Sequence, residues 1–243
     1  NKLQKYIADN HTRLVLSSYA ALEDYKSLHK NIEDVFVCHF ISDIRDKIQN
    51  LDESYIKTIS DKYDVKGDYV FLSNQFWIHK NHTIVLKAMN RIINVHGKDI
   101  TLVCTGNTED YRNKDYFGSL CDYINENSLN ENIKILGLID RNEQLALMAN
   151  ANIVIQPSLF EGWNTSVEEA KLMTKRIIMS DISTHKEQMY EHSVIFGRTD
   201  YDELASIIIE NIDNAQKTFK INEQYFKKCV ENYQSELDKL FNI

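Results

Sequence analysis

Cysteine, proline and glycine are scarce in this chain of 243 residues, which contains four, one and seven of them, respectively. The cysteines lie far apart and include no Cys-x-x-Cys pair, so their spacing does not indicate a zinc site or a disulfide framework. Cys38 and Cys104 lie within apolar runs, and buried cysteines behave as small apolar side chains. We therefore expect free thiols in a reducing compartment.

Long apolar segments and basic clusters are also missing. No uninterrupted apolar segment approaches the length of a membrane span, and the first residues do not resemble a signal peptide. The formal net charge of -8 disfavours a nucleic-acid partner. Hydrophobic residues make up 43% of the chain and charged residues 26%, which is ordinary for a globular protein with a substantial core. We expect a cytoplasmic protein that binds no nucleic acid.

Short apolar runs alternate with helical patterns from Asp68 onward. The expected strands are Tyr69–Leu72, Ile100–Cys104, Ile133–Leu136, Ile153–Ile155, Ile177–Met179 and Val194–Phe196, and the expected helices are His82–Val95, Asp115–Asn127, Asn142–Met148, Ser166–Thr174 and Asp202–Ile212. This alternation predicts an α/β, Rossmann-like fold with a parallel sheet and helices on both faces. A ligand should lie at the carboxyl ends of the strands, where residues 73–80, residues 105–107 and the loop around Glu161 would share one rim.

The loop that begins at Pro157 connects an apolar run to the helix predicted from Ser166. Such a loop presents unpaired amides and the positive end of the helix dipole, so it suits an anion. Glu161 and Glu169, eight positions apart, bracket it. Phosphate on the amides and hydroxyls on the carboxylates would together hold a sugar nucleotide. In the alternative interpretation, Thr165-x-x-Glu168 or Ser166-x-x-Glu169 is only a capping box that satisfies the first helical amides.

This stretch resembles the E-x7-E signature of family 4 glycosyltransferases, which are retaining enzymes with the GT-B fold. Glu161 and Glu169 fall on its two glutamates, Trp163 stands at its aromatic position, and Asn164 replaces its second glycine. The resemblance implies that Glu161 contacts the transferred sugar and acts catalytically, while Glu169 binds the ribose hydroxyls. The loop residues it implies in donor binding are Gly162, Trp163, Asn164, Thr165 and Ser166.

Two further segments carry the same resemblance. In the segment Phe71–His82, Lys80 matches a family lysine that neutralises the donor diphosphate, whereas Asn74 or Gln75 stands where the family has an arginine. The implied roles are catalysis for Lys80 and donor binding for Asn74 and Gln75. The turn that follows Gly137 is similar to one whose backbone meets the nucleotide base, which makes Leu138 and Ile139 candidates to frame uracil or guanine. A plain strand and turn is the alternative there.

Histidines suggest a metal site only weakly. His79 and His82 are three positions apart, but the sequence places no third ligand beside them, and His185 is remote. The resemblance implies that no metal and no other cofactor is needed, because basic residues carry the charge. The loop Met179–Gln188 resembles a family loop that we assign to packing beneath the donor site.

The resemblance also implies a domain organisation. Residues 1–40 would be the remnant of an N-terminal, acceptor-binding domain that is mostly absent here, with a strand over Arg13–Ser18, a helix over Ala20–His29 and a strand over Val35–Phe40. Residues 41–66 would connect the domains and include a helix over Glu53–Tyr63. Residues 67–215 would form the Rossmann-like nucleotide-sugar-binding domain. Residues 216–243 would form an amphipathic helix, centred on Tyr225–Leu240, that braces the first domain.

The function implied is retaining transfer of a hexose from UDP or GDP to a glycan or lipid-linked acceptor, in surface polysaccharide biosynthesis. Contact with the inner face of the membrane would come through the parent protein. The alternatives are a nucleotide-sugar-binding module that is inactive without a separate N-terminal domain, a sugar-nucleotide epimerase of the same fold, and a Rossmann-like domain that binds no donor. We expect little or no turnover by the isolated chain, because the active sites of this fold lie between two domains.

Overall fold

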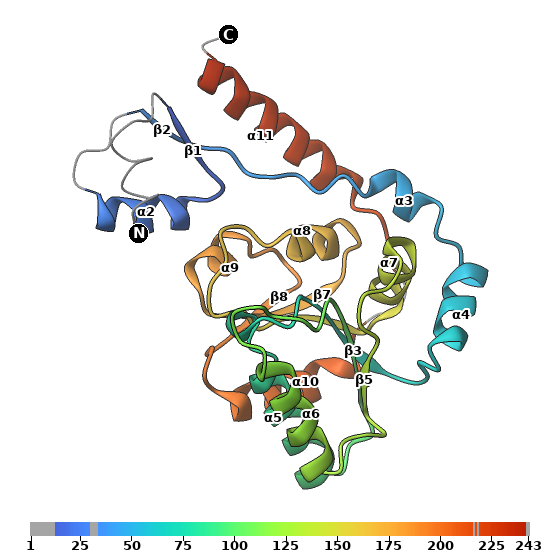
Figure 1. Ribbon diagram of the computed structural model, residues 1–243. Coiled ribbons are helices and arrows are strands. Elements are labelled where there is room, and N and C mark those ends of the chain that lie inside the picture. Colours follow the sequence, from blue (N-terminus) through green and yellow to red (C-terminus); the bar gives the residue numbers. More distant parts are fainter. Residues whose placement is uncertain (1–12, 30–33, 216, 218, 242–243) are drawn as a thin grey trace.

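A six-stranded parallel sheet forms the centre of the computed structural model, which describes residues 13–29, 34–215, 217 and 219–241. The strands run in the order β5-β4-β3-β6-β7-β8 (Figure 1). Their bounds are β3 Tyr69–Ser73, β4 Thr101–Thr105, β5 Ile133–Ile135, β6 Ile153–Gln156, β7 Arg176–Ser180 and β8 Ser193–Phe196. The predicted Rossmann-like α/β fold is confirmed, and every predicted strand overlaps an observed one.

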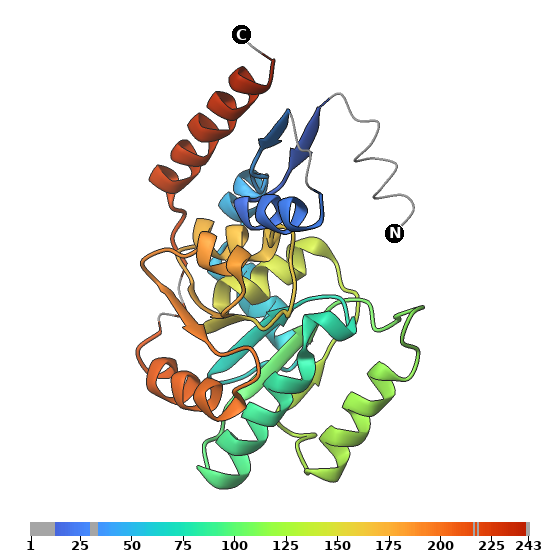
Figure 2. The same ribbon diagram turned by 90° about the vertical axis from the view of Figure 1, so that its left-hand side faces the viewer.

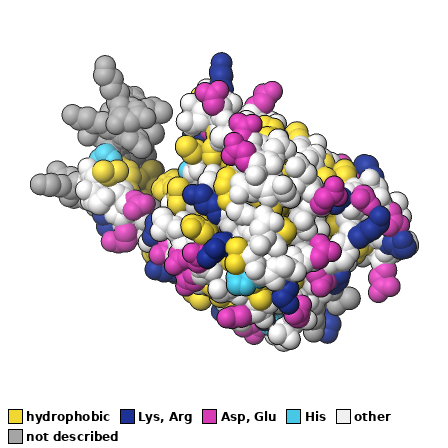
Figure 3. Space-filling view, turned by 90° about the horizontal axis from the view of Figure 1, so that it is seen from below, with side chains coloured by type: hydrophobic (Ala, Val, Ile, Leu, Met, Phe, Trp, Pro, Cys, Tyr) yellow, Lys and Arg dark blue, Asp and Glu magenta, His cyan; other side chains and the backbone are white. Residues whose placement is uncertain are grey.

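Helices cover both faces of this sheet, as Figure 1 shows. One face carries α5 (His82–Asn90), its continuation as a π-helical turn (Arg91–Val95), α6 (Tyr116–Glu126) and α10 (Tyr201–Ile212). The other carries α4 (Glu53–Lys62), α7 (Arg141–Asn150) and α8 (Thr165–Leu172), and α9 (Ser183–Glu187) lies beside α8. The outer surface seen in Figure 3 has acidic and basic side chains interspersed rather than gathered by sign.

The central strands β4, β3, β6 and β7 read as nearly continuous apolar runs because they are buried on both sides, whereas the edge strands β5 and β8 are mostly half-buried. Val70 and Leu72 of β3 pack into the cluster under α5, α6 and α10, whereas Phe71 packs into the cluster under α7 and α8. Alternate residues of a strand point to opposite faces, so a strand covered on both faces needs apolar residues at every position. Full burial of each such side chain contributes about 1.5–3 kcal/mol, and this packing fixes the strand ends where the site lies.

A second, two-stranded parallel sheet precedes this core. It consists of β1 (Leu14–Leu16) and β2 (Val35–Val37), connected through α2 (Tyr19–Leu28). The amphipathic helix α11 (Glu223–Phe241) returns to this unit and lies beside it in Figure 2. The predicted strand–helix–strand pattern and C-terminal helix are confirmed within the described residues; residues 1–12 and 30–33 of the expected remnant lie outside them, as do 216, 218, 242 and 243. The proposed domain boundaries stay a prediction.

The connection between the two sheets contains two helices, where the sequence predicts one. The predicted helix is α4, which is capped by Asp52, whose carboxylate accepts a hydrogen bond from the Tyr55 amide. The additional helix is α3 (Arg45–Gln49). It is short and has one buried residue, Ile48, so its sequence shows no helical periodicity of apolar residues. None of the described helices combines the length and hydrophobicity that a membrane span requires.

Candidate functional site

A pocket of about 330 Å³ opens at the carboxyl ends of β3 and β4, beside the first turns of α7 and α8. Its volume lies at the lower end of the range typical of small-molecule sites. The residues that line it are Ser73, Asn74, Gln75, Trp77, Lys80, Thr105, Gly106, Leu138, Ile139, Arg141, Gln144, Thr165, Ser166 and Glu169. The strand ends therefore meet at one rim, as the alternation of strands and helices predicts.

Most of the residues selected from the sequence lie in this lining: Asn74, Gln75, Lys80, Leu138, Ile139, Thr165, Ser166 and Glu169. Glu161 lies beside the pocket and is paired with Lys80. Gly162, Trp163 and Asn164 are not among the lining residues, and all three have hydrogen bonds to other parts of the protein. The binding roles of all these residues stay predictions.

Lys80 and Glu161 form a shielded ion pair. The Lys80 ammonium donates a 2.6 Å hydrogen bond to Glu161 Oε1, and the two side chains are only 14% and 9% exposed. The Ser158 hydroxyl donates to the same oxygen at 2.6 Å. Lys80 ends a short 3₁₀ helix (Ile78–Lys80), after which Asn81 adopts a left-handed conformation with φ 56°. Because an ammonium has three donors, Lys80 can bind a phosphate oxygen while it holds Glu161.

Helix α8 is capped by Asn164, the residue before its first turn, whose side chain accepts a hydrogen bond from the Val167 amide. The capping-box interpretation is therefore wrong for both candidate pairs. Glu168 instead accepts hydrogen bonds from Lys171, Gln188 and Tyr225. With Asn164 as the cap, Thr165 and Ser166 occupy the first turn at the pocket wall, where backbone amides have no carbonyl partner within the helix.

Glu169 is held from one side only. Its Oε1 accepts hydrogen bonds from the Arg141 guanidinium and, at 3.3 Å, from the Ser42 hydroxyl. Its Oε2 is buried and has no hydrogen-bond partner among the described residues. Burial raises the pKa of Glu169, and the Arg141 charge opposes that shift. A buried acceptor without a partner at a pocket wall is ready to bind a hydroxyl.

Arg141 is a site residue that sequence reasoning did not identify. It is the first residue of α7, and its guanidinium also donates to Gln144 Oε1 at 2.7 Å. The sequence could have indicated Arg141 and Gln144, because ligands bind at the carboxyl ends of parallel strands and both residues follow the turn after β5. No arginine lies at the end of β3, where the family pattern has one, so Arg141 brings a second cation to the pocket from a different loop.

Asn74 and Gln75 shape the rim through hydrogen bonds within the protein. The Asn74 side-chain amide donates to Gln156 Oε1 at 3.0 Å, and Gln75 Oε1 accepts from the Asn107 amide at 3.0 Å. Gly106, at φ +141°, passes directly under this turn: a Cβ there would lie 2.0 Å from the Asn74 carbonyl oxygen. Only glycine allows that approach.

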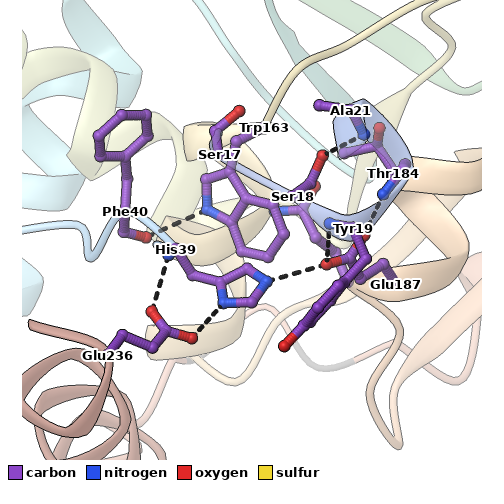
Figure 4. A network of polar contacts seen from close by, with 12 residues as sticks. Ser17, Ser18, Tyr19, Ala21, His39, Phe40, Trp163, Thr184, Glu187 and Glu236 are labelled. Atoms are coloured by element: carbon purple, nitrogen blue, oxygen red, sulfur yellow. Dashed lines mark hydrogen bonds and ion pairs between the residues drawn. The ribbon is translucent and has the colours of Figure 1, made fainter. Parts of the chain in front are cut away.

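The loop that carries Glu161 is anchored by residues that do not line the pocket, several of which Figure 4 shows. The Trp163 indole donates to the Phe40 carbonyl at 3.1 Å, and its ring centroid lies 4.8 Å from that of His39. The hydroxyls of Ser17 and Thr184 donate to the carbonyls of Gly162 and Glu161, at 3.0 and 2.8 Å. The N-terminal unit therefore sets the position of the loop directly.

The loop Met179–Gln188 packs against the start of α8 through hydrogen bonds of His185 and Gln188 to Asn164, and its place beneath a donor site stays a prediction. His185 is fully buried, hydrogen-bonded to Asn164 and Ser180, and burial lowers its pKa to about 4. His82 stacks on Phe76, with ring centroids 4.2 Å apart. Within the described residues, no three or more His, Cys, Asp or Glu side chains are grouped to hold a metal ion. The absence of a metal requirement stays a prediction.

The chain was compared with known protein families, curated proteins and solved structures. Residues 56–228 match the family model described as glycosyl transferases group 1. No curated protein matches the chain significantly.

Several solved structures have the same fold. The Anabaena protein Alr3699/HepE, solved with UDP and glucose, matches with a TM-score of 0.81 and 18% identity over 98% of this chain and 65% of its own. A glycosyltransferase from Rickettsia africae matches with 0.79 and 18% over 100% and 66%. Sucrose-phosphate synthase from Thermosynechococcus elongatus matches with 0.71 and 16% over 99% and 57%. This chain thus spans about two thirds of the first two proteins and less of the third.

Proposed function

The chain belongs to the glycosyl transferases group 1, and on that premise we propose that its pocket binds the nucleotide diphosphate part of a sugar donor. One observation carries this proposal: two shielded carboxylates, each paired with a cation, flank the amino terminus of α8 at the carboxyl ends of the central strands. Cations and helix amides suit phosphates, and carboxylates suit sugar hydroxyls.

The diphosphate is assigned to the side of the pocket formed by Lys80, Thr165 and Ser166. Here an ammonium and the first amides of α8 converge on one space. Charge-assisted hydrogen bonds of this kind stabilise the negative charge that develops on a departing diphosphate. The helix dipole adds a contribution of the same sign.

The nucleoside is assigned to the opposite side. Glu169 Oε2, buried and without a partner among the described residues, would accept a hydrogen bond from a ribose hydroxyl. Leu138, which is 79% exposed, and Ile139 follow the turn at Gly137 and would frame the base. UDP and UDP-glucose are the ligands named for HepE, which supports a UDP-hexose donor, with a GDP-hexose as the other candidate.

The reaction we propose is hexosyl transfer with retention at the anomeric carbon. The bond between that carbon and the diphosphate oxygen breaks, a bond to an acceptor hydroxyl oxygen forms, and the acceptor proton leaves with the diphosphate. Glu161, fixed by Lys80 and Ser158, would orient the hexose through its hydroxyls and stabilise positive charge on the ring. The acceptor is proposed to be a glycan or lipid-linked saccharide of surface polysaccharide biosynthesis.

A binding module that needs a further domain for turnover is the second candidate. This candidate rests on the donor pocket alone. It predicts donor binding without transfer or hydrolysis by this chain. An epimerase would instead convert the nucleotide sugar without any acceptor.

Calorimetric titration tests the proposed donor site. UDP, GDP and their glucose, galactose and mannose derivatives would be titrated into the wild-type chain and into Lys80→Ala and Glu169→Gln. We expect one base to be preferred and its affinity to fall at least about tenfold in both variants, the equivalent of one charge-assisted hydrogen bond. Lys87→Ala, on the exposed side of α5, is the matched control and should bind normally. Equal binding by all four proteins would refute the assignment.

A further inference from the structure

His39 lies where three separate segments meet. It follows β2 and contacts α9 through Glu187 and α11 through Glu236 (Figure 4). Its ring nitrogens lie 2.7 Å (Nδ1) from Glu236 Oε1 and 2.9 Å (Nε2) from Glu187 Oε1, and its backbone amide donates to Glu236 Oε2 at 2.9 Å. One imidazole therefore connects two carboxylates that lie 148 and 197 positions further along the chain.

The two ring contacts require two protons. A neutral imidazole carries one N–H, so one of its nitrogens would turn a lone pair toward a carboxylate oxygen. The imidazolium donates to both. The carboxylates are 19% and 17% exposed, so solvent shields their charges poorly.

Burial lowers the pKa of His39, but the hydrogen bonds and negative charges of Glu187 and Glu236 outweigh the effect of burial, and the net shift of the pKa is upward. The other titratable neighbours are the Tyr19 phenol, whose ring centroid lies 5.6 Å from that of His39, and the adjacent Cys38 thiol.

This cluster is continuous with the loop that carries Glu161. The His39 ring packs against Trp163, whose indole donates to the carbonyl of the next residue, Phe40. Glu187 also accepts hydrogen bonds from the Tyr19 and Ala20 amides at 3.0 Å, so it caps α2 from outside.

The same segments hold the loop backbone. Ser17, just before α2, donates to the Gly162 carbonyl, and Thr184 of α9 donates to the Glu161 carbonyl. Both segments are thus tied to His39 through Glu187 and fixed to the loop through these hydroxyls.

We propose that doubly protonated His39 is a positioning residue for the donor site: it joins Glu187 to Glu236 and thereby fixes the loop Glu161–Trp163, which loosens when His39 loses a proton. Residues 161–163 carry the carboxylate assigned to the hexose, so the consequence for donor binding rests on the proposed function. The consequence for the loop itself does not, because Trp163 reports on it directly.

The test is a pH titration of the ¹⁵N-labelled chain followed by NMR between about pH 5.5 and 9, a range that spans the ordinary imidazole pKa. The chain has two tryptophans, so the Trp163 indole N–H is one of two signals and is assigned with Trp163→Phe. We expect this signal to shift with a midpoint above the ordinary imidazole value of about 6.5, coincident with the midpoint of the His39 ring signals.

Three variants sharpen the result. Glu187→Gln should lower the midpoint, and His39→Gln should abolish the titration and leave Trp163 in its high-pH position. His192→Gln, which removes a partly exposed histidine paired with the neighbouring Glu191, is the matched control and should titrate like the wild type. A Trp163 signal that does not move in the wild type, or that titrates unchanged in His39→Gln, would overturn the proposal.

Donor affinity gives a second readout. UDP-glucose, which carries the hexose assigned to Glu161, should bind the wild type about fivefold more weakly above the midpoint than below it, the range expected for one lost hydrogen bond, and His39→Gln should show no such change. If neither UDP-glucose nor GDP-mannose binds at any pH, the proposed function fails, while the Trp163 titration still decides the role of His39. Affinity that is constant across the midpoint while Trp163 moves would refute the coupling to the donor site.

Discussion

Replacing Arg141 by methionine should expose how strongly the pocket depends on the Arg141–Glu169 pair. Methionine keeps much of the apolar stem and removes the guanidinium, which leaves the Ser42 hydroxyl as the one hydrogen-bond donor to Glu169 among the described residues, with the Lys47 charge also acting on it. The Glu169 side chain is 7% exposed and that of Arg141 is 34% exposed. The pair is therefore intermediate between an exposed ion pair, which contributes about 0–1 kcal/mol, and a buried one, whose disruption costs about 3–5 kcal/mol. We expect Arg141→Met to lower the free energy of unfolding by about 1–2 kcal/mol near neutral pH.

The loss should shrink as the pH falls. Burial raises the pKa of Glu169, so between its unfolded and folded pKa values the folded state binds more protons and stability decreases as the pH rises. Removing Arg141 raises that pKa further and widens the window. At a pH below both pKa values Glu169 is neutral in the folded and in the unfolded protein, so the Arg141 guanidinium has no Glu169 charge to stabilise.

Urea denaturation followed by circular dichroism measures these quantities in the wild type, Arg141→Met, Glu169→Gln and the double variant. The coupling energy from this cycle should be about 1 kcal/mol near neutral pH and should approach zero at acid pH. Arg91→Met, which breaks an exposed pair with Asp202, is the control and should change stability by less than about 0.5 kcal/mol. Additive single effects near neutral pH would refute the reasoning.

Three further outcomes follow from the packing around the pocket. Gly106→Ala should destabilise the protein by about 1–3 kcal/mol and weaken UDP binding, because its Cβ would lie 2.0 Å from the Asn74 carbonyl oxygen; unchanged melting and UDP titrations would contradict this. Burial lowers the pKa of His185 to about 4, so the stability that His185 contributes should be present above its unfolded value of about 6.5 and be lost as the pH falls toward the folded value; His185→Asn should flatten this part of the urea-denaturation profile. Cys104 is buried and burial raises its pKa to about 12, so mass spectrometry should find it alkylated by iodoacetamide only after unfolding, and labelling at the native rate of half-buried Cys229 would contradict its burial.

The sheet and the rim of the pocket were predictable because they depend on local pattern. Strands buried on both faces must be apolar throughout, and the carboxyl ends of parallel strands must meet at one edge. The apolar run Tyr69–Leu72 therefore identifies a strand, and that strand in turn places residues 73–80 at the rim. Helix α3 was not predicted, because a single buried side chain gives no helical periodicity in the sequence.

The pairings within the site were not predictable from local pattern. Lys80 and Glu161 are 81 positions apart and meet only because β3 and β6 are neighbours in the sheet. The position of Trp163 depends on Phe40, 123 positions earlier. The choice of Asn164 as the cap of α8 follows from the same tertiary setting, in which Gln156 and His185 hold its side chain.

The central claim is that a nucleotide diphosphate lies between the first turn of α8 and the turns after β3 and β5. Backbone chemical-shift mapping of the ¹⁵N-labelled chain during titration with UDP and GDP tests it most directly. One of the two nucleotides should produce saturable shifts concentrated at Gly106, Leu138, Thr165 and Ser166, which form part of the pocket wall. Shifts confined to the separate groove lined by Leu51, Ile56 and Phe219, or no saturable shifts with either nucleotide, would contradict the account.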